Sequence, residues 1–173
     1  VGEWFDHPED LAAVLGAHVD AIAVRVGDQA RVERIAEAAG VPVINAGTSL
    51  WSPFDALAAL RTMGMWHGRL EGRVLACIGD GNAVAHSLMV AGALCGMEVR
   101  LAHPRGFAPD PDVAATARDL AARHGGAILV THDPEEALSG VDGVYVTPWP
   151  VRDEAVPDAS VQAHFEAFRI DAR

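Results

Sequence analysis

The chain has 173 residues, half of them hydrophobic, and a formal net charge of −11. A chain of this length can bury one sizeable core, and its acidic balance, with no lysine in the sequence, excludes the basic face that nucleic acid requires and disfavours an anionic membrane surface. Its two cysteines, Cys77 and Cys95, lack the spacing of a metal site or a disulfide framework, so we expect reduced thiols.

Membrane insertion and export are not expected. No apolar run approaches the roughly 18 residues that a spanning helix requires. No charged-then-apolar leader precedes Asp6. We therefore expect a cytoplasmic protein.

Strands and helices are predicted to alternate along the chain. The first helix is predicted to begin at Pro8 with Asp6 as its cap, and the apolar runs and turn residues place the others. Further helices are predicted over residues 28–40, 53–65, 82–95, 111–124, 134–138 and 158–168. Strands are predicted over residues 21–26, 42–46, 73–78, 98–102, 127–130 and 143–146. This alternation predicts an α/β fold in which a parallel sheet has helices on both faces, a Rossmann-like three-layer α/β/α arrangement.

One segment, residues 77–88, reads as a buried strand that runs through a glycine turn directly into a helix. In parallel α/β sheets ligands gather at the carboxyl ends of strands, and this makes Asp80 the best-placed acid in the chain. The alternative is that Asp80 is a turn residue bonding its own backbone. Asn82 is expected to cap the helix.

Several kinds of site are excluded by the residues themselves. Gly79-x-Gly81 lacks the third glycine of a dinucleotide fingerprint, the histidines are scattered without metal-ligand spacing, and Ser87 has no glycine-x-serine-x-glycine elbow around it. We expect neither a cofactor nor a metal.

An ordered set of motifs resembles a known family. The set spans nearly the whole chain and comprises Val43-Ile44-Asn45, Gly79-Asp80-Gly81-Asn82, His103-Pro104-Arg105-Gly106-Phe107, Pro109-Asp110-Pro111, Thr131-His132-Asp133-Pro134 and Val144-Tyr145 ahead of Trp149. In this order they resemble ornithine carbamoyltransferases and related transcarbamoylases, mainly their amino-acid-binding domain. The resemblance implies that residues 1–51 are a remnant of the carbamoyl-phosphate-type domain and that residues 52–173 form an amino-acid-binding-type α/β domain.

The resemblance also shows what this chain lacks. The family's phosphate-holding serine-threonine-arginine-threonine loop has no counterpart, and neither does its C-terminal portion. Its histidine-proline-x-glutamine motif aligns with a segment in which Ser52 and Asp55 replace the histidine and the glutamine. A carboxylate there would repel a developing oxyanion. Ser52 also suits a helix cap ahead of a proline.

Two further substrate positions differ from the family pattern. The second amide of the family's asparagine pair is Ala83 here, and the aspartate that holds the substrate amino group aligns with Thr147. An α-ammonium group thereby loses its charge partner. Arg152 lies in the following loop, where it can face an anion or simply solvent.

Three hypotheses about function remain. The first is a non-self-sufficient subunit of a split transcarbamoylase-like enzyme, which acts on an amino-acid-derived small molecule, for example in natural-product assembly, and relies on a second protein chain for the anion-binding domain. The second is an ornithine carbamoyltransferase itself, as a fragment or divergent form. The third is a structural or stabilising partner without a ligand. The cleft candidates are Ser52, Asp55, Asp80, Asn82, Thr147 and Arg152, with no catalytic residue assigned.

Overall fold

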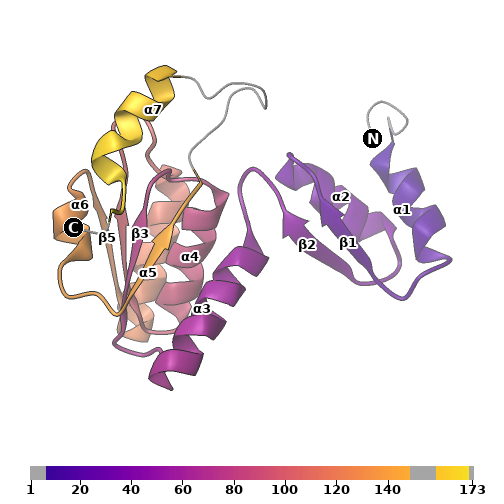
Figure 1. The fold of residues 1–173 in the computed structure, drawn as a ribbon. Helices are drawn as coiled ribbons and strands as arrows, with labels where there is room; N and C mark the ends of the chain where they lie inside the picture. The colour runs from indigo at the N-terminus through magenta and orange to yellow at the C-terminus, as the bar shows by residue number, and fades with distance from the viewer. Residues whose placement is uncertain (1–6, 149–158, 172–173) are drawn as a thin grey trace. The chain divides into compact units, whose positions relative to one another are not determined.

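Strands and helices alternate along the computed structural model, which describes residues 7–148 and 159–171 (Figure 1). The chain divides into two units, Val1–Phe54 and Asp55–Arg173, each with its own sheet. The division follows from the sheets, because no strand pairing joins the two among the described residues.

The first unit is small and holds a two-stranded parallel sheet. Its elements are α1 (Pro8–Gly16), β1 (Ile22–Arg25), α2 (Gln29–Ala38) and β2 (Val43–Gly47). Ile22 pairs with Val43, and the register shifts at Arg25. A cluster of buried residues, Ala12, Ile35 and Ala39, packs under the inner side chains of the strands. Ile44 points away from this cluster and is 44% exposed.

The second unit holds a four-stranded parallel sheet in the order β5-β4-β3-β6. Its strands are β3 (Val74–Ile78), β4 (Glu98–Ala102), β5 (Ala127–Thr131) and β6 (Gly143–Val146). The chain therefore moves outward from β3 through β4 to β5 and then returns to the other side of β3. This reversal creates a topological switch point between β3 and β6.

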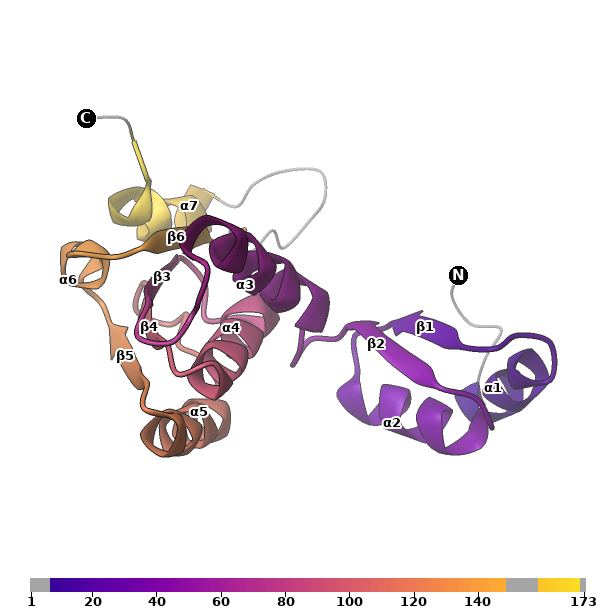
Figure 2. The same ribbon diagram turned by 90° about the horizontal axis from the view of Figure 1, so that it is seen from below.

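Helices cover both faces of the larger sheet. They are α3 (Pro53–His67), α4 (Ala83–Leu94), α5 (Pro111–His124), α6 (Pro134–Leu138) and α7 (Ala159–Phe165), followed by the 3₁₀ turn η1 (Glu166–Phe168). Figure 2 shows α3, α4 and α5 on one face and α6 with α7 on the other. This is the three-layer α/β/α arrangement that the alternation predicts.

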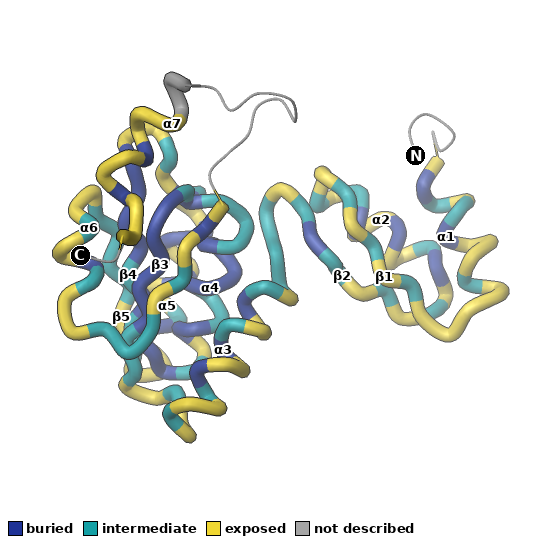
Figure 3. Tube along the Cα trace, viewed as in Figure 1, coloured by how far each residue is buried: buried dark blue, intermediate teal, exposed yellow. Residues whose placement is uncertain are grey.

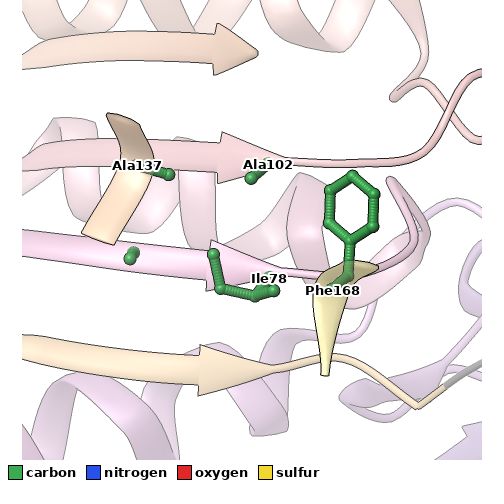
Figure 4. Packing of buried hydrophobic residues seen from close by; sticks show 5 residues of the cluster. Ile78, Ala102, Ala137 and Phe168 are labelled. Atoms are coloured by element: carbon green, nitrogen blue, oxygen red, sulfur yellow. The ribbon is translucent and has the colours of Figure 1, made fainter. Parts of the chain in front are cut away.

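The core lies around the two central strands, β3 and β4, which Figure 3 colours as buried. Leu75, Cys77 and Leu101 are fully buried or nearly so, since two layers of helices cover these strands. On the α6 face, Ala76, Ile78 and Ala102 pack against Ala137 and Phe168 (Figure 4).

The helix caps predicted at Asp28, Asn82 and Asp110 are confirmed. The side chains of Asp28, Asn82 and Asp110 accept hydrogen bonds from backbone N–H groups in the first turns of α2, α4 and α5. His7, without a side-chain hydrogen bond, occupies the cap position of α1, and Asp6 lies outside the described residues. The final helix is shorter than expected, because its last turn tightens into η1.

Candidate site at the switch point

The turn after β3 is shaped by its two glycines. Gly79 has φ of +129°, and a side chain there would clash with Thr147. A Cβ on Gly81 would lie 2.6 Å from the carbonyl carbon of Ala108 and 2.8 Å from the carbonyl oxygen of Phe107. Only glycine lets the backbone approach both neighbouring segments this closely. The close contacts of the turn therefore explain the two glycines of the Gly79-x-Gly81 pattern.

Thr147 ties the end of β6 to this turn. Its hydroxyl oxygen accepts a hydrogen bond from the backbone N–H of Asp80 at 2.7 Å, and it lies 3.3 Å from the carbonyl oxygen of Asp80 and 3.4 Å from that of Ile78. The residue is 1% exposed. The hydroxyl of Thr147 is thus engaged in holding the switch point together.

Asp80 lies half-buried in the turn itself. Burial raises the pKa of its carboxyl group, while a hydrogen bond from the Asn82 side chain, the nearby His86 and the backbone N–H of Gly81 lower the pKa and offset part of that effect. The Asp80 carboxyl group thus has hydrogen-bond partners within its own turn. Asn82 uses its side-chain oxygen to cap α4 at the N–H groups of Val84 and Ala85.

The loop after β4 forms the adjacent wall. The backbone N–H of Gly81 donates to Phe107 at 2.9 Å, and that of Asp110 donates to Nε2 of the buried His86 at 2.9 Å. Nε2 of His86 is thus an acceptor, and any proton on the neutral ring resides on Nδ1. The turn, the β4 loop and α4 are consequently one hydrogen-bonded assembly.

Two histidines extend this wall toward β5. The rings of His103 and His132 meet edge to face with centroids 4.6 Å apart, and Nδ1 of His132 lies 2.9 Å from the carbonyl oxygen of His103. Burial is the main reason that the pKa of His103 is lowered; its hydrogen bond to the Pro104 carbonyl opposes this shift. A neutral His103 suits a structural position between two strand ends.

The remaining candidates are Ser52, Asp55 and Arg152. Ser52 is half-buried and directly precedes α3 in the first unit. Asp55 lies in the first turn of α3, where it lines a groove with Tyr145 and is one of the reasons, after burial, that the pKa of Tyr145 is raised. Arg152 lies outside the described residues. Among the candidates described within the second unit, the structure brings together Asp80, Asn82 and Thr147.

Sequence reasoning passed over two polar features. In the first unit, the Gln29 side-chain oxygen accepts from Nδ2 of Asn45 and from the hydroxyl of Thr48, at the carboxyl ends of β1 and β2. In the second, Tyr145 faces the groove beside α3. The position of Asn45 and Thr48 at the end of a predicted strand could have identified them as polar candidates. The surroundings of Tyr145 could not be predicted in this way, because they depend on how α3 packs against the sheet.

The cluster offers hydrogen-bonding groups and no activated nucleophile. Burial, with Asp80 nearby, raises the pKa of the Cys77 thiol to about 12, so it stays protonated. Both cysteines are free, with Cys77 buried and Cys95 half-buried. Within residues 7–148 and 159–171, no group of three or more His, Cys, Asp or Glu side chains is arranged to hold a metal ion. Nor is any described helix long and apolar enough to cross a membrane.

The fold and the switch-point turn define a parallel α/β protein of the kind that binds small molecules at strand ends. The family described as "Aspartate/ornithine carbamoyltransferase, Asp/Orn binding domain" matches residues 71–173, and the companion "carbamoyl-P binding domain" matches residues 4–64. The chain belongs to the aspartate/ornithine carbamoyltransferase family.

Individual relatives agree with this assignment. An ornithine carbamoyltransferase of Parafrankia sp. is 46% identical over 165 residues, which are 95% of this chain and 52% of the relative. The crystal structure of ornithine carbamoyltransferase from Gloeobacter violaceus is 43% identical, with a TM-score of 0.81 over 83% of this chain and 50% of that one. For the enzyme from Pyrococcus furiosus the identity is 37% and the TM-score 0.91, over 98% of this chain and 53% of that one. The chain spans about half the length of the relatives it matches.

Proposed function

We propose that this chain is a non-self-sufficient subunit of a split carbamoyltransferase-type enzyme. It contributes the amino-acid-side wall of the cleft, formed by Asp80, Asn82 and Thr147 at the switch point. A second protein chain contributes the anion-binding segment. The substrate in this proposal is an amino-acid-derived molecule that carries an amine.

The incomplete first unit carries the proposal. Its sheet has two strands among the described residues, and Val14, Val19 and Ile44 are 61%, 42% and 44% exposed. A two-stranded sheet with one covered face has little independent stability, since three or more strands or further covering elements are needed. Such a unit is expected to require a complement from outside these residues.

The replaced residues support a changed role in chemistry. The family's reaction, by resemblance, is attack of a substrate amine on the carbamoyl carbon with departure of phosphate. Ser52, Asp55 and Thr147 stand where the resemblance places the groups that polarise the carbonyl and hold the amine. In the proposed complex the anionic leaving group is held by the second chain. A related reaction, in which an amine displaces an anionic group within one amino-acid-derived molecule, as in natural-product assembly, is compatible with these replacements.

A second candidate is an ornithine carbamoyltransferase of which these residues are one part. The observation that favours it is the 46% identity to a relative that carries this name, over 95% of this chain. The third candidate is a structural partner without a ligand, and it is favoured by the engagement of Thr147 and Asn82 in local hydrogen bonds.

An assay of carbamoyl transfer by the chain, alone and in a complex, distinguishes the three candidate functions. The full chain is incubated with ornithine and carbamoyl phosphate, alone and together with the proteins encoded beside its gene, and citrulline formation and phosphate release are measured. The proposal predicts no turnover by the chain alone and turnover or phosphate release only in a complex. Citrulline formation by the chain alone would contradict it.

Substitutions then separate a cleft from a structural partner. If the complex is active, alanine at Asp80 or at Asn82 of the proposed wall is expected to lower its turnover by about tenfold or more while assembly is retained. Unchanged turnover in both variants would support the structural partner instead.

A further inference from the structure

Histidine side chains fasten both ends of the β4 loop, residues 103–110. At its start, Nδ1 of the buried His103 lies 2.8 Å from a backbone carbonyl oxygen, and its ring meets that of His132 edge to face. At its end, the backbone N–H of Asp110 donates to Nε2 of His86 at 2.9 Å. The loop is therefore held by imidazole rings where it leaves the sheet and where it enters α5.

The two hydrogen bonds respond differently to a proton on the ring. The nitrogen of His103 that faces a carbonyl oxygen must donate, and it does so in both the neutral and the charged ring. Nε2 of His86 accepts, which requires that this nitrogen carries no proton. A proton on Nε2 would set two N–H groups against each other across 2.9 Å. Protonation therefore breaks the bond at His86 and leaves the bond at His103 intact.

His86 is buried, with 6% or less of its surface exposed like its neighbour Ser87, and it is the one titratable residue of α4. Its surroundings therefore decide how the ring meets a proton. The titratable and charged groups at this end of the sheet come from the segments around α4, and they are Cys77 of β3, Asp80 of the turn, His103, Arg105 and Asp110 of the β4 loop, Asp112 of α5, His132 after β5 and His164 of α7.

Asp80 interacts electrostatically with His86. Burial is the main influence on this carboxyl group and raises its pKa, and the nearby histidine is among the groups that lower the pKa. The Asp110 carboxylate is engaged with backbone N–H groups in the first turn of α5, and burial raises the pKa of the Cys77 thiol to about 12. Asp80 is thus the carboxylate that a charged His86 ring can pair with, whereas a neutral ring pairs with the N–H of Asp110.

The loop end that His86 holds is also the wall of the switch-point site. The N–H of Gly81 donates to the loop at 2.9 Å, and a Cβ on Gly81 would clash with the loop backbone. Residues 107–110 therefore lie directly against the turn that carries Asp80. When Asp110 is released from His86, this segment loses one of the hydrogen bonds that keep it there.

We propose that His86 is a positioning residue that makes this wall sensitive to pH. The neutral ring holds residues 107–110 against the β3–α4 turn, and a proton on Nε2 releases them. Acid therefore loosens the wall, and alkali orders it. The consequence for a ligand rests on the proposed function, in which the same turn is part of the cleft.

Hydrogen exchange measured by mass spectrometry tests this on the full chain, either alone or in the complex in which it is soluble. Parent and His86→Gln are compared at the same pH, so that the intrinsic exchange rates cancel. The glutamine side-chain oxygen can accept the Asp110 N–H and does not titrate. Residues 106–113 report this amide well, because Pro109 and Pro111 carry no N–H.

The expected result follows the range of about pH 5 to 8 in which histidine side chains change charge. At a pH of about 8, residues 106–113 exchange alike in the two proteins. At a pH of about 5.5, the Asp110 amide of the parent is expected to exchange about tenfold faster than that of His86→Gln, because it has lost a hydrogen bond. His18→Gln, which removes an exposed histidine of the first unit, is the control and is expected to follow the parent at both pH values.

A comparison within the parent covers the case in which the buried glutamine disturbs the fold or does not accept the bond. After correction for intrinsic rates, residues 106–113 are expected to lose about tenfold in protection between a pH of about 8 and about 5.5, while residues 114–122 of α5 keep theirs. General acid unfolding would affect both segments.

Two results would overturn the inference. One is equal exchange of residues 106–113 in the parent and in a folded His86→Gln variant at both pH values. The other is protection of residues 106–113 in the parent that does not fall with pH, or that falls only as much as that of residues 114–122. Neither readout depends on turnover or on a partner, whereas citrulline formation by the chain alone would refute the proposed function and leave the exchange result standing.

Discussion

Asp80 combines burial with a position at the end of β3. Burial raises the pKa of its carboxyl group in the folded chain above the ordinary value of 3.8. The folded state therefore retains a proton that the unfolded chain has already released, and stability falls as pH rises from about 3.8 through the folded-state pKa. Above that pKa the penalty is constant.

The Asp80→Asn variant removes this titration. The free energy of unfolding of the parent chain minus that of the variant is expected to decrease with rising pH in this window and then to level off. Urea unfolding of both proteins across pH of about 3.5 to 7 measures the difference, in which groups common to both cancel. A difference that increases with pH would show that the carboxylate is stabilised by its neighbours more than it is penalised by burial.

Residue-scale predictions succeed where the partner is close in sequence. Asn82 caps the helix that it precedes, and Asp80 bonds within its own turn, as short-range turn and cap preferences indicate. The bond from Asp80 to Thr147 joins residues 67 positions apart, and no local pattern encodes it. The family resemblance singled out Thr147 as a replaced aspartate, but its buried structural bond emerged only from the fold.

At the scale of elements, the approach of the β3–α4 turn to the β4 loop is the tightest constraint near the site. Gly81→Ala would press a methyl group against the backbone of residues 107–109, which cannot move as a flexible side chain can. We expect a loss of about 2–3 kcal/mol or more in the free energy of unfolding, measured with urea.

Gly64→Ala in α3 is the control for this substitution. Nothing lies within 4 Å of a Cβ at Gly64, so alanine is expected to stabilise the helix by about 0.5–1 kcal/mol. Equal effects of the two substitutions would show that the Gly81 contact is not rigid.

Element positions follow closely from the sequence because apolar runs and caps are local. The predicted strand at 98–102 and helix at 111–124 coincide with β4 and α5. The order of the strands in the sheet, unlike their positions in the sequence, cannot be predicted from periodicity alone. Periodicity does not indicate whether β6 pairs beside β3 or extends the sheet past β5. The placement of β6 depends on how the helices cover the two faces of the sheet, and this is decided only when the layers pack together.

At the scale of the whole molecule, both units leave apolar surface open. Among the residues that the structure describes, the first has a two-stranded sheet with Ile44 exposed, and in the second β6 pairs with β3 alone and Val144, Val146 and Trp66 are exposed. Composition gives no hint of this, because half of the residues are hydrophobic in any case. The family resemblance led us to expect exposed apolar sheet and helix faces, and the structure shows which side chains are exposed.

The most direct test of a non-self-sufficient subunit is its native mass. Size-exclusion chromatography with light scattering is applied to the full chain expressed alone and together with the proteins encoded beside its gene. The account predicts an aggregating or poorly soluble chain alone and a defined complex with a second protein. A monodisperse single particle formed by this chain alone, with no gain in stability from any neighbour, would contradict it.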